Sequence, residues 1–200
     1  MLQKTAAALR RNKYEVSIFE TKEEAASYLN GLFQGKSIGF GDSKTLVQLG
    51  LYASLRQNNT VIDPAQFHDH DSFNAAAREA LTTEYFFTSV NALTEDGVMV
   101  NLDGTGNRIA GSLFGHKKVF FVVGRNKIMP PLDQAIDRVR NVAAPLNAQR
   151  IGLPNPCVVR GDRCYDCSSQ RRICNALVIH LKKMNDMDME VVLINQDLGL

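Results

Sequence analysis

Two hydrophobic periods alternate along the first part of the chain. Apolar residues recur at helical spacing over residues 2–12, whereas residues 14–19 alternate polar with apolar side chains. Thr21 and Glu24 have the spacing of a capping box, which begins a helix that continues through residues 25–33. The pattern therefore predicts a helix, a half-buried strand and a second helix, in that order.

The same alternation continues to the end of the chain. Strand patterns occupy residues 36–40, 60–62, 84–88, 98–100, 119–123 and 190–194, and helix patterns occupy residues 45–49, 73–81, 173–184 and a segment that starts at Pro130 and Pro131. The run at residues 119–123 is continuously apolar, as is typical of a strand covered on both faces. Strands that alternate with helices predict one α/β domain over residues 1–200 with a largely parallel sheet.

Composition and charge exclude several classes of partner. Hydrophobic residues make up 44% of the chain and charged residues 22%, which is ordinary for a compact globular protein. The 23 basic and 21 acidic residues are interspersed, so we expect no nucleic-acid partner. No window approaches the roughly 20 apolar residues of a membrane span or resembles a signal peptide. We expect a cytoplasmic protein without a membrane partner, and self-association into a homo-oligomer stays open.

A glycine-rich turn follows the strand at residues 36–40. The candidate ligand-binding residues in it are Gly39, Gly41, Asp42, Ser43, Lys44 and Thr45. Glycines permit close backbone approach, and hydroxyls, a lysine and free amides at a helix start suit a phosphate or carboxylate. The alternative is that Asp42 or Ser43 only caps the following helix. The turn thus predicts a small anionic ligand.

Two later turns carry further candidates. Thr94, Glu95 and Gly97 lie at a strand exit, where Glu95 is a candidate catalytic acid or base if burial raises its pKa. The alternative is a solvated turn in which the Asp-Gly pair at residues 96–97 reverses the chain. Asn107 and Arg108 follow a glycine turn, and Arg108 is either a bidentate carboxylate ligand or a surface arginine.

All four cysteines of the chain lie between residues 157 and 174. They are Cys157, Cys164, Cys167 and Cys174. Four thiolates complete a zinc site or hold an iron–sulfur cluster, and a reducing compartment disfavours structural disulfides. Zinc sites more often use two C-x-x-C pairs, so we expect an iron–sulfur cluster ahead of zinc. A redox dithiol and reduced structural thiols are the alternatives.

Residues 87–98, 103–108 and 122–128 together resemble the LUD domain, the family of lactate-utilisation protein C. The family has a turn rich in Gly, Ser and Thr, then T-E-x-G, G-x-x-R and V-V-G-x-x-K-I segments, and all occur here in that order. The resemblance implies a fold like that of ribose-phosphate isomerase, glucosamine-phosphate deaminase and CoA transferases. In those relatives the first glycine-rich turn holds a phosphate or carboxylate.

The resemblance also implies a function, although a fold alone does not fix a reaction. We expect a protein that binds a small carboxylate or phosphate, carries the cysteine site and serves as a subunit of an organic-acid oxidation system, with iron–sulfur redox proteins as partners. Whether it is an enzyme stays open. The alternative is a non-catalytic accessory protein that transfers electrons or is regulatory and stapled by a metal.

Overall fold

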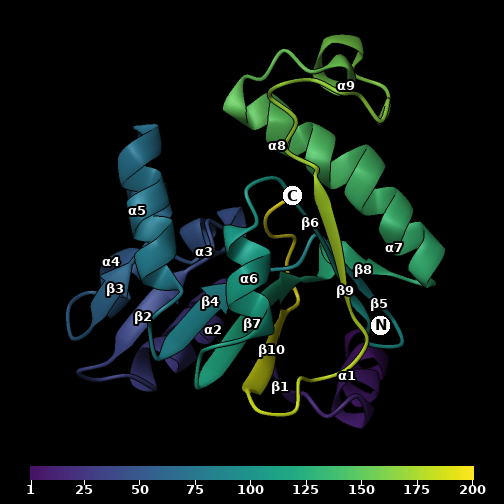
Figure 1. The fold of residues 1–200 in the computed structure, drawn as a ribbon. Helices are drawn as coiled ribbons and strands as arrows, with labels where there is room; N and C mark the ends of the chain where they lie inside the picture. The colour runs from purple at the N-terminus through teal and green to yellow at the C-terminus, as the bar shows by residue number, and fades with distance from the viewer.

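A six-stranded sheet forms the centre of the computed structural model, which describes residues 1–200 (Figure 1). In spatial order its strands are β1 (Glu15–Phe19), β10 (Asp188–Ile194), β7 (Lys118–Gly124), β4 (Tyr85–Thr88), β2 (Ser37–Phe40) and β3 (Thr60–Ile62). Every neighbouring pair in this sheet is parallel. The predicted α/β class with a largely parallel sheet is therefore confirmed.

Helices cover both faces of this sheet. One face carries α1 (Leu2–Arg11), α5 (His70–Ala80) and α6 (Asn107–Leu113), and the other carries α2 (Lys22–Gly31), α3 (Lys44–Gln48) and α4 (Leu51–Leu55). Strand β7 is buried on both sides, since Val119 and Phe121 join one core and Phe120 and Val122 the other. The continuous apolar run of this strand reflects that double burial. None of the helices has the length and apolar character needed to cross a lipid bilayer.

A second, smaller sheet was not predicted. Its order is β8 (Ile128–Met129), β5 (Ala92–Thr94), β6 (Met99–Asp103) and β9 (Ala176–His180), and only the pair of β8 and β5 is parallel. Helix α7 (Leu132–Arg138) packs on it through Ala135, which meets Ala92 and Val100 in a small apolar core. Strands β8 and β5 have only two and three residues, and β9 falls in a segment whose apolar spacing predicted a helix. The sequence therefore predicted only part of β6, at residues 98–100, as a strand.

Helix α7 runs into α8 (Ala144–Ile151) through one π-helical turn, η3 (Val139–Ala143). The amide of Ala144 donates to the carbonyl of Val139, five residues earlier, and the next residue, Pro145, has no amide to donate. The widened turn accommodates the proline without ending the helix. As a result α8 extends beyond the small sheet, toward α9 (Pro156–Arg160) and the cysteine segment (Figure 1).

The predicted helix at residues 173–184 is wrong. This segment contains β9, which pairs antiparallel with β6 so that Ile179 lies opposite Val100 and Leu177 opposite Leu102. The edge of β6 offers backbone partners along its length, and the adjacent β-branched Val178 and Ile179 favour a strand. The apolar residues have helical spacing, but pairing with a strand that is far away in the sequence makes this segment a strand.

Substitution of Gly39 tests how closely the sheet and the end of α5 approach each other. A Cβ added to Gly39 would lie 2.4 Å from the carbonyl oxygen of Ala80 and 2.7 Å from Oγ1 of Thr83. Because Ala80 contributes backbone, we expect Gly39→Ala to lower the free energy of unfolding by about 1–3 kcal/mol in urea denaturation. Gly31→Ala, with no atom within 4 Å, is the matched control and should leave stability unchanged or higher. Equal midpoints for both variants would contradict this packing.

Candidate functional site

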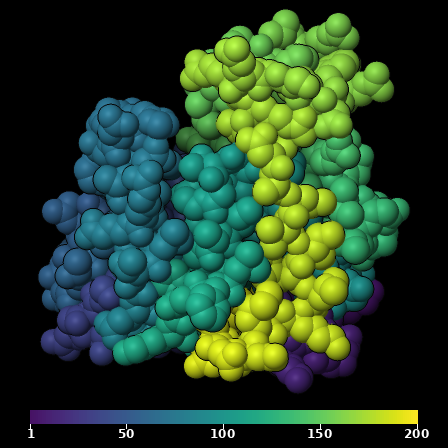
Figure 2. Space-filling view, viewed as in Figure 1, coloured from purple at the N-terminus to yellow at the C-terminus, as the bar shows by residue number.

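A cavity of about 570 Å³ opens where the chain reverses direction across the sheet. Strand β2 leads into α3 on one face, whereas the chain after β4 leads to α6 on the other face. Ligands of parallel sheets bind at such switch points, beyond the carboxyl ends of the strands. Phe67 and Phe73 line one side of the cavity and Asn147 and Ile151 the other. Figure 2 shows a hollow in the surface between the blue region of α5 and the green region that contains α8.

The cavity brings together two of the predicted loops, which are far apart in the sequence. The predicted residues that line it are Gly41, Asp42, Ser43, Lys44, Thr45, Asn107 and Arg108. Gly39 does not line it, because its Cα faces the end of α5. Thr94, Glu95 and Gly97 also lie outside the lining. The structure thus unites the first glycine turn with the segment around Arg108 and leaves out the turn of Glu95.

Lys127 lies at the inner end of the cavity and is only 3% exposed. Its Nζ donates hydrogen bonds to Oγ1 of Thr45 at 3.0 Å and to Oγ of Ser89 at 2.9 Å. Burial, followed by the positive charges of Arg138 and Arg108, lowers the pKa of Lys127 to about 7. Near neutral pH this amine therefore exchanges readily between its charged and neutral forms.

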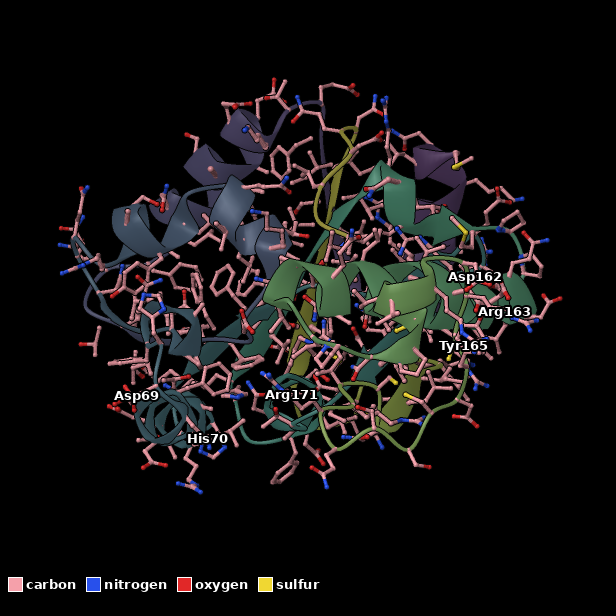
Figure 3. The ribbon with its side chains drawn as sticks, turned by 90° about the horizontal axis from the view of Figure 1, so that it is seen from above. Asp69, His70, Asp162, Arg163, Tyr165 and Arg171 are labelled. Carbon is pink, nitrogen blue, oxygen red and sulfur yellow. The ribbon has the colours of Figure 1, made fainter.

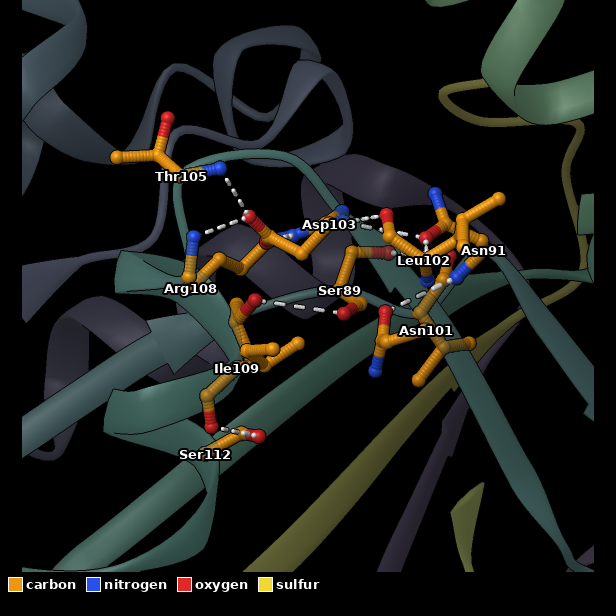
Figure 4. Close-up of polar contacts among 12 residues, drawn as sticks. Ser89, Asn91, Asn101, Leu102, Asp103, Thr105, Arg108, Ile109 and Ser112 are labelled. Carbon is orange, nitrogen blue, oxygen red and sulfur yellow. Dashed lines mark hydrogen bonds and ion pairs between the residues drawn. The ribbon is translucent and has the colours of Figure 1, made fainter. Parts of the chain in front are cut away.

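The guanidinium of Arg108 is held in place by three acceptors (Figure 4). Its Nε donates to Asp103 at 3.0 Å, and its Nη2 donates to the carbonyl of Leu102 at 2.7 Å and to the side chain of Asn91 at 3.1 Å. Asp103 also accepts from the amide of Thr105 at 3.1 Å. These bonds use Nε and Nη2, so Nη1 is the donor that Arg108 still offers to a ligand.

Positive charge exceeds negative charge around the cavity. The charged lining residues are the cations Lys44, Arg108, Lys127 and Arg150 and the carboxylates Asp42 and Asp103. Arg138 lies close behind, where it donates to the carbonyl of Asn91 at 2.5 Å, and burial lowers its pKa. Buried cations that face one another are unfavourable unless an anion joins them. The cavity is therefore electrostatically suited to an anion.

The backbone of the first loop is shaped for close packing against this cation cluster. A Cβ on Gly41 would lie 3.0 Å from Cγ of Arg108, and Asp42 has a left-handed φ of 44°. Ser43 is the N-cap residue of α3, but its hydroxyl makes no capping hydrogen bond. Since the hydroxyl is not used as a cap, it is available to a ligand in the cavity.

The turn that contains Glu95 packs against α1 instead. Glu95 forms a 2.5 Å ion pair with Lys4 at the surface, and Nδ2 of Asn12 donates to the carbonyls of Asp96 and Gly97. A Cβ on Gly97, whose φ is 85°, would lie 2.9 Å from the amide nitrogen of Leu9. The glycine is required by this close approach and by its positive φ. This environment gives Glu95 no contact with the cavity.

The four cysteines gather around a second, much smaller cavity of about 20 Å³. All four are half-buried free thiols, and burial, together with the neighbouring thiols, raises the pKa of Cys157 and Cys174. No group of three or more His, Cys, Asp or Glu side chains is arranged here to hold a metal ion. Figure 3 shows Asp162 and Tyr165 of this segment on the side of the molecule away from Asp69, the N-cap of α5.

The residues that sequence analysis missed are Lys127, Ser89, Asn91 and Arg138. The first three follow the carboxyl ends of β7 and β4, where ligand-binding residues of parallel sheets concentrate. Lys127 also stands in the V-V-G-x-x-K-I segment, three residues after the end of the apolar strand β7. That position could have identified Lys127 as a candidate site residue from the sequence. Arg138 lies within a helix and gave no comparable signal.

The fold and this cavity define a class of α/β proteins with a polar site beyond the carboxyl ends of a parallel sheet. The sequence profile of the LUD domain family matches residues 2–194, and the chain belongs to this family. It is thus a protein of the lactate-utilisation type in general. A crystal structure of a DUF162 family protein from Deinococcus radiodurans is similar in fold, with a TM-score of 0.52 and 12% sequence identity over 96% of this chain and 95% of that chain. Comparison with curated proteins gave no match.

Lys127 should leave a signature in the pH dependence of stability. Its pKa is about 7 in the folded protein, against an ordinary value of 10.5, so between these pH values the unfolded chain binds more protons. The free energy of unfolding should therefore rise with pH in this window, by at most about 1.4 kcal/mol per pH unit from this group.

We expect Lys127→Met to remove that rise, as measured by urea denaturation from pH 6 to about pH 10. Lys182→Met, at an exposed lysine with no salt bridge, is the control and should keep the wild-type slope. If Lys127→Met and the wild type show the same slope, Lys127 does not titrate as described.

Proposed function

We propose that the protein binds a small organic carboxylate or phosphate in the 570 Å³ cavity, as part of an organic-acid oxidation system of the lactate-utilisation type. One observation carries the proposal. Lys127 is buried beside two arginines, Arg108 and Arg138, and Asp103 is the acidic side chain that forms an ion pair within this group, with Arg108. Arg138 donates to the backbone oxygens of Asn91 and Leu200. An anion that enters the cavity relieves this repulsion, which supports affinity for negatively charged ligands.

In anion binding, the hydroxyls of the cavity donate hydrogen bonds, and the cations supply the attracting charge. Ser43 and Thr45 come from the loop after β2 and Ser89 from the loop after β4, so donors converge from neighbouring strand ends. Lys44 is exposed and lies at the rim, where a charge mainly attracts the ligand. The volume is within the range of roughly 300–1,000 Å³ that is typical of small-molecule sites. A small organic acid fills only a part of it, which leaves room for a second reactant.

Lys127 is the residue that we expect to transfer protons in the cavity. An amine that titrates near pH 7 is suited to accept a proton from a hydroxyl oxygen, or to donate one to a carbonyl oxygen, beside a bound carboxylate. It also takes up a proton when an anion binds next to it, because the charged form is then stabilised. Iron–sulfur redox proteins are the partners expected for an oxidation of this kind.

Proton uptake gives a direct test. Above pH 7, where Lys127 is mostly neutral, we expect the binding of L-lactate or inorganic phosphate to take up close to one proton per chain. Titration calorimetry in two buffers with different ionisation enthalpies measures this number. Lys127→Met should abolish the uptake and weaken binding at least tenfold, and Lys182→Met should change neither. If neither anion binds, or if they bind equally well to Lys127→Met, the proposal is wrong.

Lys44 offers a second, milder test at the rim of the cavity. We expect saturating phosphate to raise the melting temperature of the wild-type protein, because a ligand that binds only the folded state stabilises it. Lys44→Ala should reduce this gain several-fold in apparent affinity, more strongly at low salt than at high salt. Lys36→Ala, outside the cavity lining, is the matched control. If phosphate raises the melting temperature of both variants equally, Lys44 does not contribute to anion binding.

A further inference from the structure

The cysteine segment is folded around its four thiols. Cys157 lies in α9, Cys164 and Cys167 lie in an irregular loop, and Cys174 precedes β9, yet all four line one cavity of about 20 Å³. No disulfide joins any of them. Four thiols from a stretch of eighteen residues, most of it irregular, lie around one cavity, although such a loop buries little apolar surface of its own. Their convergence is the first observation that indicates a ligand.

The backbone around the central pair already has the form of a metal-binding turn. Asp166 has a left-handed φ of 45°, which closes the turn between Cys164 and Cys167. The amide of Asp166 points at Sγ of Cys164, with an N···S distance of 3.4 Å. Amides that donate to sulfur stabilise a thiolate, as expected of groups that support metal ligands.

Side chains outside the thiols hold the two halves of the segment together. Asn155, only 3% exposed, donates to the carbonyl of Arg171 at 3.1 Å and accepts from the hydroxyl of Ser169 at 2.7 Å. Arg172 donates to the carbonyls of Cys167 and Cys174 at 2.6 and 3.1 Å. These bonds place Cys157 beside the later cysteines, and the charge of Arg172 lies next to the thiols.

The cavity between the four thiols is small. A void of about 20 Å³ is slightly more than the roughly 10–15 Å³ that one water molecule needs. One ion is a smaller guest for such a void than a cluster of several iron and sulfide atoms. We therefore take zinc as the ion to test first, ahead of the iron–sulfur cluster that the cysteine spacing led us to expect.

We propose that Cys157, Cys164, Cys167 and Cys174 bind one zinc-class divalent ion, which fixes the segment that forms one wall of the ligand cavity. The thiols release their protons to solvent as the thiolates coordinate the ion. In the structure the side chains are not yet arranged at coordinating positions, so the sulfurs turn inward when the ion binds. The ion acts as a structural staple and undergoes no redox change.

The link between this ion and the larger cavity is direct. Ala144 and Ile173 line both cavities, so the two are separated by a single layer of side chains. The backbone of Ile173 lies so close to Gly104 that a Cβ there would be 2.7 Å away, and Asn175 donates to the carbonyls of Asp103 and Gly104. Fixing Cys174 therefore fixes the wall next to Asp103.

Metal content and spectroscopy test the site without reference to any anion. Protein purified under reducing, oxygen-free conditions should contain about one zinc per chain. After chelation it should bind one equivalent of Co²⁺ with the intense visible bands of a tetrahedral tetrathiolate complex. Cys157→Ser and Cys174→Ser should lose these bands, whereas Ser168→Ala, in the same exposed loop, should keep them. If a cysteine variant fails to fold, Co²⁺ titration of the chelated wild type is the decisive measurement.

Hydrogen exchange tests the staple. We expect zinc to slow amide exchange in residues 157–176 and 103–105 and to leave α2 unchanged. A brown protein that contains both iron and sulfide would overturn the single-ion proposal, as would a chelated protein whose four thiols react equally fast with and without zinc. Because neither measurement uses lactate or phosphate, failure here is distinct from failure of anion binding.

Discussion

The interaction on which the site depends is the burial of the Lys127 amine among hydroxyls and arginines. A lone buried cation is costly, and two neighbouring guanidinium groups increase the cost. Lys127 lies three residues after the end of the buried strand β7, at the end of the 3-10 turn η2 (Arg125–Lys127), where its side chain is 3% exposed and lines the cavity. Folding energy from the aromatic and aliphatic core thus maintains an electrostatically strained site, as is common where a ligand completes the structure.

The smaller sheet provides what the parallel sheet lacks, a second wall. Leu102 and Asp103 of β6, with Asn91 immediately before β5, hold Arg108 in position. The helix that covers this sheet passes through a π-helical turn and continues as α8 along the opposite side of the cavity. The site is therefore assembled from two sheets, and neither sheet alone contains it.

Local pattern was sufficient where one interaction dominates a segment. The apolar run of β7, the capping box at Thr21 and Glu24, and the glycine turn after β2 were all found in the sequence and lie where expected. The pattern failed at residues 173–184, because the backbone partners of β9 come from β6, more than 70 residues earlier. Helical spacing records which side chains are apolar, but pairing with a distant strand decides the backbone conformation.

The sequence by itself determined the α/β class, the family, the loop at residues 41–45 and the grouping of the cysteines, since each depends on residues that are neighbours in the chain. Only the tertiary structure decided that this loop meets Arg108 and Lys127, while Glu95 pairs with Lys4 at the surface. It also decided that Ile173 separates the cysteines from the ligand cavity by one layer of side chains. The reason is physical: charge, burial and distance between groups far apart in the chain exist only after the strands have been ordered in space.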